Sequence, residues 1–342
     1  MNRSNSHSLL WTLLGVGAAV AARAYVKHQR TMRFAGKTVV ITGGSRGLGL
    51  VMARQFAIEG ANVAICARDA DELIRAEADL LQYGPDILAI TCDLTRKPDI
   101  DAFITTVEQQ FGPIDVLVNN AGVISVSPYE NTTEEDFKLA MDSNFWAAYR
   151  TIEAALPGMR DRARTHPCRI VNIASIGGKV AIPHMTPYSA SKFALVGYSE
   201  GIRAELLKDG ILVTTVCPGL IRTGSPRHAI VKGQTEKEYA WFKIADALPL
   251  LTVSAETCAK QVIDACRIGQ AEIVVSLPAK TLTALHNLMP GLFMDTMSVV
   301  NRLLPSPGGI GEASAKGYES ESAVSRSFVA TLADQAAEAN NE

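Results

Sequence analysis

The chain has 342 residues, of which 47% are hydrophobic and 20% are charged, and 33 Lys and Arg against 35 Asp and Glu leave a formal net charge of −2. This composition excludes a disordered chain, a collagen-like chain and a small disulfide scaffold, and the length allows one large core or two smaller ones. Nucleic-acid binding needs a strong basic excess and stacked aromatic side chains, so the near-neutral charge and 6% aromatic content argue against a nucleic-acid partner.

An uncharged run, Leu9–Ala22, lies near the beginning of the chain and is followed by a basic flank of Arg23, Lys27, Arg30 and Arg33. The run is short for a membrane span, which takes about 20 residues, and becomes marginal when it is extended to Val26. Because the positive charge follows the run, we expect residues 1–33 to be a membrane anchor with the rest of the protein on the cytoplasmic face. A cleaved signal peptide and a buried N-terminal helix are the alternatives.

Seven short apolar runs rich in β-branched residues predict buried strands. They are Lys37–Thr42, Asn62–Ala67, Ile87–Thr91, Asp115–Val118, Arg169–Ala174, Leu212–Cys217 and Glu272–Ser276. Segments of helical period lie between them, such as Leu48–Glu59, which ends at Gly60, and Pro187–Lys208, which ends near Gly210. The alternation predicts an α/β fold with a Rossmann-like, doubly wound parallel sheet of about seven strands, formed by one domain over residues 34–276.

A glycine-rich loop follows the first predicted strand and opens the first predicted helix. It consists of Thr42, Gly43, Gly44, Ser45, Arg46, Gly47, Leu48 and Gly49. Glycines here allow a tight turn and let N–H groups at a helix N-terminus approach a pyrophosphate, although such a loop can also be a plain strand-to-helix turn. The spacing T-G-x-x-x-G-x-G departs from G-x-G-x-x-G and resembles that of the short-chain dehydrogenase/reductase family.

The end of the second strand bears on the choice between NAD and NADP. An acid there would bind the ribose 2′-OH of NAD, whereas an arginine would pair with the 2′-phosphate of NADP. The resemblance places the NAD-selecting acid at Ala67, which has no carboxylate, while Arg68 follows it and Arg46 lies in the glycine loop. We therefore predict NADP as cofactor, with NAD as the alternative. Asp69 does not fit this prediction, since its carboxylate would either bind the ribose 2′-OH of NAD or neutralise Arg68.

Two further strings are similar to the cofactor cleft of the same family. Asp93 and Leu94 end the third strand, where the family places an adenine contact, and Asn120, Ala121 and Gly122 end the fourth. Small residues at this point would let adenosine pack closely, and the Asn amides could tie neighbouring strands together. Read alone, the second string is also an ordinary turn.

The catalytic residues are predicted from a Tyr and a Lys placed four apart on one helix face, Tyr188 and Lys192. A nearby ammonium favours the phenolate, so we expect Lys192 to lower the pKa of Tyr188 and to make it a proton donor and acceptor for a carbonyl/alcohol pair. Ser175, at the end of the fifth strand, can steady the substrate oxygen, and Asn144 lies in the preceding helix. The structural alternatives are a surface Tyr–Lys pair, a strand-end cap and a helix-bending polar residue.

Together these residues match the short-chain dehydrogenase/reductase pattern, and the N-terminal run resembles membrane-associated members. The resemblance implies that Tyr188 is the general acid/base, that Lys192 also holds the nicotinamide ribose, that Ser175 orients the substrate and that Asn144 positions a water beside Lys192. It also implies that Pro218 and Gly219 flank the nicotinamide and that Thr223 bonds its carboxamide or a phosphate. Family members are often oligomers, so a homo-oligomer is an expectation too.

The resemblance leaves the substrate open. The segment Gly224–Leu251, where the family places its variable lid, carries several large apolar residues, as does the stretch before Tyr188. We expect a lipophilic ketone or alcohol, such as an acyl chain, a steroid or a retinoid, although plain lid packing explains the same residues. An NAD-linked alcohol dehydrogenase and a non-catalytic cofactor sensor or scaffold remain alternatives. His184 is interpreted as a residue of the pocket rim.

The last part of the chain divides into two segments. Residues 277–304 carry apolar side chains at helical spacing, interrupted by Pro290 and Gly291, and predict either core or subunit packing or a lid or membrane-surface helix pair. Residues 305–342 are rich in Ser, Gly, Ala and Glu and predict a flexible tail. The six cysteines include no C-x-x-C pair, so we expect buried free thiols and no metal site.

Overall fold

The computed structural model describes residues 17, 25, 30–84, 86–326 and 331–342. The predicted anchor within residues 1–33 therefore lies almost wholly outside the described residues. Over the part that is described, none of the helices combines the length and the apolar character that crossing a bilayer requires.

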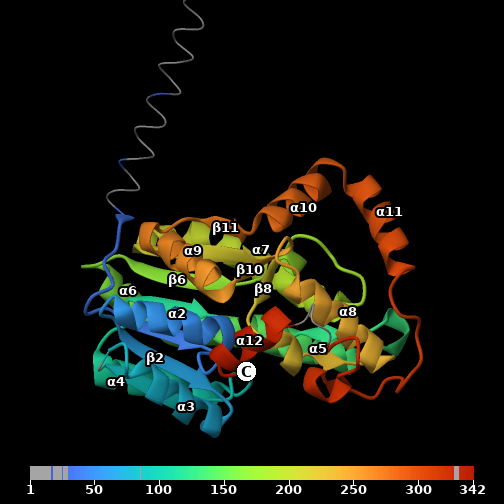
Figure 1. Cartoon of the computed structure of the whole chain (residues 1–342). Helices are drawn as coiled ribbons and strands as arrows, with labels where there is room; N and C mark the ends of the chain where they lie inside the picture. The colour runs from blue at the N-terminus through green and yellow to red at the C-terminus, as the bar shows by residue number, and fades with distance from the viewer. Residues whose placement is uncertain (1–16, 18–24, 26–29, 85, 327–330) are drawn as a thin grey trace, which may run out of the picture.

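A seven-stranded parallel sheet forms the centre of the molecule (Figure 1). Its strands are β1 (Thr38–Thr42), β2 (Asn62–Ala67), β3 (Ile87–Thr91), β4 (Val116–Asn119), β6 (Cys168–Ile173), β7 (Ile211–Pro218) and β11 (Glu272–Val275). Their order is β11-β7-β6-β4-β1-β2-β3, which confirms the predicted doubly wound sheet. The strand order reverses direction at β1, so a crevice opens beyond the carboxyl ends of β1 and β4.

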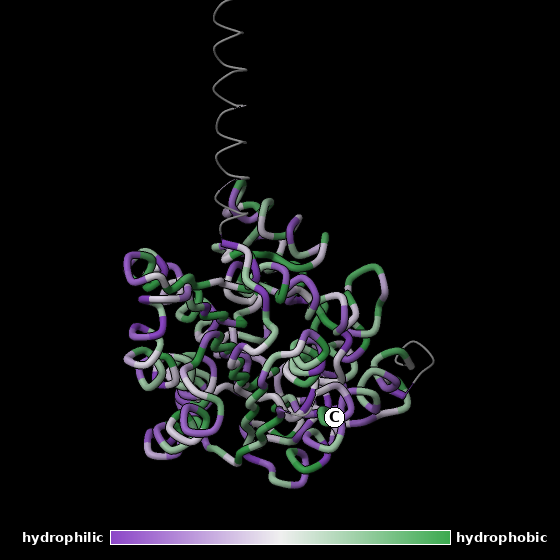
Figure 2. Tube along the Cα trace, turned by 90° about the vertical axis from the view of Figure 1, so that its left-hand side faces the viewer, coloured by the Kyte–Doolittle hydropathy of each residue, from purple (hydrophilic) through white to green (hydrophobic). Residues whose placement is uncertain are grey.

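Helices cover both faces of the sheet because its strands are apolar on both sides. The helices α2 (Gly47–Ile58), α3 (Ala70–Leu80) and α9 (Ala255–Ile268) bury their apolar sides against one face. The other face is covered by α4 (Lys97–Phe111), α6 (Ala147–Ala163) and α7 (Thr186–Leu206). The outer helices alternate between hydrophilic and hydrophobic stretches (Figure 2), as expected for helices that bury one side. All six cysteines are buried free thiols, as predicted.

The segment 277–304 forms α10 (Leu277–Leu288) and α11 (Pro290–Asn301), which meet at the predicted Pro290 break. Both helices project from the body of the molecule (Figure 1). Only Ala279 and Phe293 are buried among the residues of these two helices, whereas Leu277 and Leu288 are each 76% exposed. Core packing within this chain is therefore the wrong interpretation for most of their apolar side chains.

Residues 305–342 differ from the predicted flexible tail. Here β12 (Ala315–Lys316) pairs antiparallel with β9 (Ile230–Val231), and α12 (Thr331–Ala339) follows after a short 3₁₀ turn. The buried side chains of α12 are Ala333 and Ala337, four residues apart. The lack of large apolar residues predicts disorder here, but alanines at this spacing give a helix a flat side that packs closely. Further strands and helices of the described chain are β5 (Ser125–Val126), α5 (Glu134–Met141), β8 (Leu220–Arg222), α8 (Thr235–Ala247) and β10 (Thr252–Ser254).

Candidate active site

A cavity of about 710 Å³ lies at the carboxyl ends of the strands. Every predicted catalytic residue lines it, and so does every predicted cofactor-binding residue except Thr42 and Gly49. Those two lie beneath the cavity wall. The Thr42 hydroxyl accepts from the N–H of Asn120 at 3.0 Å and from that of Ala121 at 3.2 Å, and Gly49 packs directly against the Gly43 carbonyl. Residues far apart in the sequence are thus brought into one site.

The glycine loop is shaped by close backbone approaches. Gly43 has a φ of 63°, and a Cβ there would lie 2.8 Å from Cα of Ala121. Gly47, with a φ of 55°, begins α2. These conformations favour glycine, and they place the N-terminal N–H groups of α2 at the cavity, where the helix dipole favours an anion. The loop therefore fits a phosphate-bearing ligand.

The Asn120 side chain fastens this loop to the end of β4. Its Nδ2 donates to the carbonyl oxygens of Thr42 and Gly43 at 3.1 and 2.9 Å. The neighbouring Asn119 donates to Asn172 of β6 at 2.9 Å, so a second amide ties two adjacent strands. The expectation that these amides join strands agrees with the structure, whereas a direct contact with adenosine stays a prediction.

Tyr188 and Ser175 lie together at the inner end of the cavity. Both side chains line the cavity, and the Ser175 hydroxyl accepts from the Gly177 N–H at 3.0 Å. A Cβ at Gly177 would lie 3.1 Å from Cε1 of Tyr188, so a larger residue at this position would crowd the tyrosine ring. The pair presents two hydroxyls that can bind one substrate oxygen.

The protonation of Tyr188 differs from our expectation. Burial raises its pKa to about 12, although the neighbouring Ser175 hydroxyl acts in the opposite direction. Lys192 does not offset the effect of burial: its Nζ lies 5.8 Å from the ring centroid and donates to the Ile173 carbonyl at 2.9 Å. Burial also lowers the pKa of Lys192 to about 8. At neutral pH the site therefore holds a neutral phenol beside an ammonium.

Asn144 lies in a π-helical turn, Asp142–Trp146, which connects α5 to α6. Its Oδ1 accepts from the Val123 N–H at 2.8 Å, and its Nδ2 donates to Ser191 of α7 at 2.9 Å. A Cβ at Gly122 would lie 2.5 Å from Oδ1 of Asn144 and 3.5 Å from Nζ of Lys192. Asn144 thus joins the β4 loop to α7 close to the ammonium, and its role toward a water stays a prediction.

The outer end of the cavity carries three basic side chains among several acidic ones, and it includes residues that were not predicted. Arg46 pairs with Glu72 at 2.6 Å, and the Ser45 hydroxyl donates to the same carboxylate at 2.9 Å. Arg68 lines the cavity together with Lys316 of β12. The spacing Asp69-x-x-Glu72 is a helix-start signal that could have pointed to Glu72, whereas nothing in the sequence pointed to Lys316.

The role of the discordant Asp69 is structural. Its Oδ1 accepts from the main-chain N–H of Glu72 at 2.9 Å, so it is the N-cap of α3. Neither of the two roles that we considered, binding a ribose hydroxyl or neutralising Arg68, is needed to explain it.

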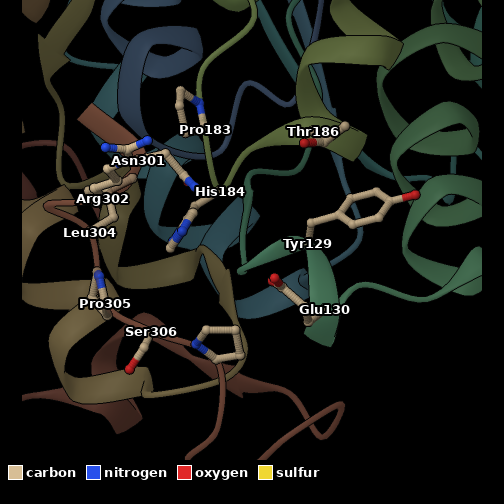
Figure 3. A pocket seen from close by; sticks show the side chains of 11 residues that line it. Tyr129, Glu130, Pro183, His184, Thr186, Asn301, Arg302, Leu304, Pro305 and Ser306 are labelled. Atoms are coloured by element: carbon tan, nitrogen blue, oxygen red, sulfur yellow. The ribbon is translucent and has the colours of Figure 1, made fainter. Parts of the chain in front are cut away.

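The inner end of the cavity is more apolar and includes Ile182 and Met185 before α7 and Phe242 of α8. His184 lies instead on a separate cavity of about 300 Å³ with Tyr129 and Arg302 (Figure 3). Its Nδ1 is 2.9 Å from Oε1 of Glu238, which is fully buried in α8. His184 therefore fastens the lid helix to the segment that precedes Tyr188.

Comparisons with known proteins agree with this geometry. Residues 37–230 match the family model of short chain dehydrogenases. The Dehydrogenase/reductase SDR family protein 7-like of Drosophila melanogaster is 34% identical over 271 residues, which are 77% of this chain and 80% of that protein.

Two solved structures share the fold. L-sorbose reductase of Gluconobacter frateurii, complexed with NADPH and L-sorbose, is 29% identical with a TM-score of 0.64, over 72% of this chain and 97% of that one. A variant of the actinorhodin polyketide ketoreductase with NADPH is 28% identical with a TM-score of 0.63 over the same shares. The chain belongs to the short-chain dehydrogenase family of oxidoreductases.

Proposed function

We propose that the protein is an NADP(H)-dependent oxidoreductase that interconverts a ketone and a secondary alcohol on a substrate with an apolar body. The observation that carries the proposal is that Ser175 and Tyr188 lie side by side in one cavity with Lys192 and the glycine loop. A bound nicotinamide supplies the hydride. The glycine loop and the N-terminus of α2 would hold its phosphates, and Lys192 would face its ribose.

The residues of this chain provide the proton chemistry. In the reducing direction the neutral phenol of Tyr188 donates its proton to the carbonyl oxygen while Ser175 holds that oxygen in place. The raised pKa of Tyr188 suits this direction, because the phenol stays protonated at neutral pH. The ammonium of Lys192, held by the Ile173 carbonyl, lies close enough to stabilise the phenolate that forms.

The choice of NADP rests on the basic side chains at the outer end. Arg46, Arg68 and Lys316 line that part of the cavity, and Asp69 is used as a helix cap. Guanidinium groups bind phosphate in a bidentate manner. The NADPH complexes of the two related reductases support the same choice.

An apolar substrate is supported by Ile182, Met185 and Phe242, which line the cavity beside Tyr188. The ketoreductase similarity agrees with a ketone substrate. The test is a panel of carbonyl compounds, from polar ketoses to acyl and polycyclic ketones, with NADPH oxidation as the readout. We expect turnover to increase with the apolar area of the substrate, and preferential turnover of ketoses would contradict the apolar assignment.

We also propose that residues 1–33 anchor the protein to a membrane with the catalytic domain on the cytoplasmic side. The support is in the sequence, where the uncharged run Leu9–Ala22 precedes four basic residues.

A further inference from the structure

We propose that residues 331–342 form an autoinhibitory strap that occupies the phosphate end of the cofactor cleft and must leave before NADP(H) binds. This inference rests on the proposed function. The strap consists of α12 and the three residues Asn340, Asn341 and Glu342 that follow it. Figure 1 shows α12 and the end of the chain beside α2 at the carboxyl ends of the strands.

The strap accepts a hydrogen bond from the first main-chain N–H group of α2. The main-chain N–H of Gly47 donates to the carbonyl oxygen of Asn340 at 2.9 Å. This donor is at the helix N-terminus, where a phosphate of the cofactor would accept hydrogen bonds. A single N–H at this position cannot serve both the strap and the phosphate.

Asn341 binds the loop itself. Its Nδ2 donates to the carbonyl oxygens of Ser45 and Glu72 at 2.8 and 3.1 Å, and its Oδ1 accepts from Nε of Arg75 at 2.8 Å. The side chain therefore bridges the glycine loop and α3, the two elements that form the outer end of the cleft.

The side chain of Glu342 enters the site as an anion would. Its Oε2 lies 3.6 Å from Nε of Arg46 and 3.3 Å from Nε2 of His228. Its Oε1 lies 2.6 Å from the point that a Cβ on Gly47 would occupy. The side chain is only 3% exposed and lines the cleft. The carboxyl thus takes the space above α2 that the cofactor phosphates need.

Burial and nearby acidic groups disfavour the ionised form of Glu342. Arg46 and Arg227 favour its ionised form, whereas Glu72 and the buried Asp246 disfavour it. Burial is the largest influence and raises the pKa of Glu342 to about 7. Ionising the Glu342 carboxyl in this buried position therefore costs free energy. A phosphate, with several hydrogen-bond acceptors, is a stronger ligand for Arg46.

Within the strap, the helix α12 makes the contacts with the lid helix α8 and with α2. Lys243 of α8 is 2% exposed and pairs with Asp334 at 2.8 Å. A Cβ at Gly224 would lie 2.5 Å from Cβ of Ala337, so α12 is in close contact with the segment that follows β8. Arg54 of α2 donates to the Ala339 carbonyl at 3.0 Å. Because the strap touches both α2 and the lid helix α8, its departure would free both walls of the cleft.

The test compares the full chain with a chain that ends at residue 330, and it measures the Kd for NADP⁺ by calorimetry. If the strap is docked in about nine of ten molecules, its removal tightens binding about tenfold. Glu342→Gln should give part of this gain, and Glu338→Gln, on the exposed side of the same helix, should give none. A synthetic peptide of residues 331–342 should compete with NADP⁺ on the shortened chain.

Amide hydrogen exchange provides a second measurement on the full chain. We expect NADP⁺ to accelerate exchange in residues 331–342, because the strap is displaced. Weaker binding after shortening, or slower exchange with NADP⁺, would overturn the inference, since the segment would then be a cover for the bound cofactor. Equal binding by both chains would also overturn it and would leave the proposed function intact. Absence of NADP⁺ binding by either chain would overturn both.

Discussion

Lys192 and Tyr188 lie on one side of α7, yet the Nζ of Lys192 is directed to the Ile173 carbonyl at 2.9 Å and lies 5.8 Å from the centre of the tyrosine ring. The ammonium is thus positioned by the end of β6 and approaches the phenol without bonding to it. Burial then dominates both groups, raising the pKa of Tyr188 to about 12 and lowering that of Lys192 to about 8. The pair is set for proton donation at neutral pH.

Replacement of Tyr188 by Phe should remove the proton donor and little else. Positioned general acids contribute roughly 10²- to 10⁴-fold to a rate, so we expect kcat with NADPH and a ketone to fall by that order while the Kd for NADP⁺ changes little. Tyr129→Phe is the matched control, because Tyr129 is 71% exposed and lines the other cavity. A Tyr188→Phe variant with near-normal kcat would show that another group donates the proton.

The pH dependence of kcat/KM should follow the ionisation of Lys192. A lysine with a lowered pKa is charged below that value and neutral above it, so the stabilising ammonium is present at pH 7 and is lost as the pH rises through about 8. We expect kcat/KM for reduction to decline above pH 8, with Tyr188 still protonated. Stopped-flow measurement of kcat/KM from pH 6 to pH 10 would test this, and a flat profile over that range would count against the assignment.

The strands could be predicted from the sequence because each is a continuous apolar run, and the observed ends of all seven lie within one residue of the predicted ones. The site followed from the fold, since parallel strands bring their carboxyl ends to one edge. The pKa of Tyr188 could not be predicted, because it depends on burial by residues distant in the sequence. The contact between Asn341 and Ser45 could not be predicted either, because local composition does not indicate a contact between residues 296 positions apart.

Residues 1–33 should determine where the protein resides. A chain that lacks them should be recovered in the soluble fraction, whereas the full chain should sediment with membranes and resist extraction with high salt, because an apolar anchor is not screened by ions. Cell fractionation followed by a salt and a detergent wash distinguishes the two. Complete recovery of the full chain in the soluble fraction at low salt would disprove the anchor.

Arg68 should determine the preference for NADP over NAD. Hydrogen bonds to charged groups contribute about 1.5–3 kcal/mol, so Arg68→Ala should weaken NADP⁺ binding by roughly tenfold to a hundredfold and leave NAD⁺ binding nearly unchanged. The control is Arg164→Ala, an arginine that is 80% exposed and pairs only locally with Asp161. Equal losses for the two coenzymes would mean that Arg68 supports the fold of the cleft and does not recognise the 2′-phosphate.

Two glycine-to-alanine substitutions should have opposite effects on stability. A Cβ at Gly49 would overlap the main-chain oxygen of Gly43 and lie 2.6 Å from Nδ2 of Asn120, so the glycine loop would have to shift. Such overpacking costs about 1–3 kcal/mol, and the shift should also weaken NADP⁺ binding. Gly197, inside α7, has nothing within 4 Å of its Cβ position. Alanine there should raise stability by about 0.5–1 kcal/mol, because it lowers the backbone entropy lost on folding. Thermal unfolding of both variants, with and without NADP⁺, tests the pair, and a Gly49→Ala protein that unfolds and binds like the wild type would contradict the close approach on which the phosphate loop depends.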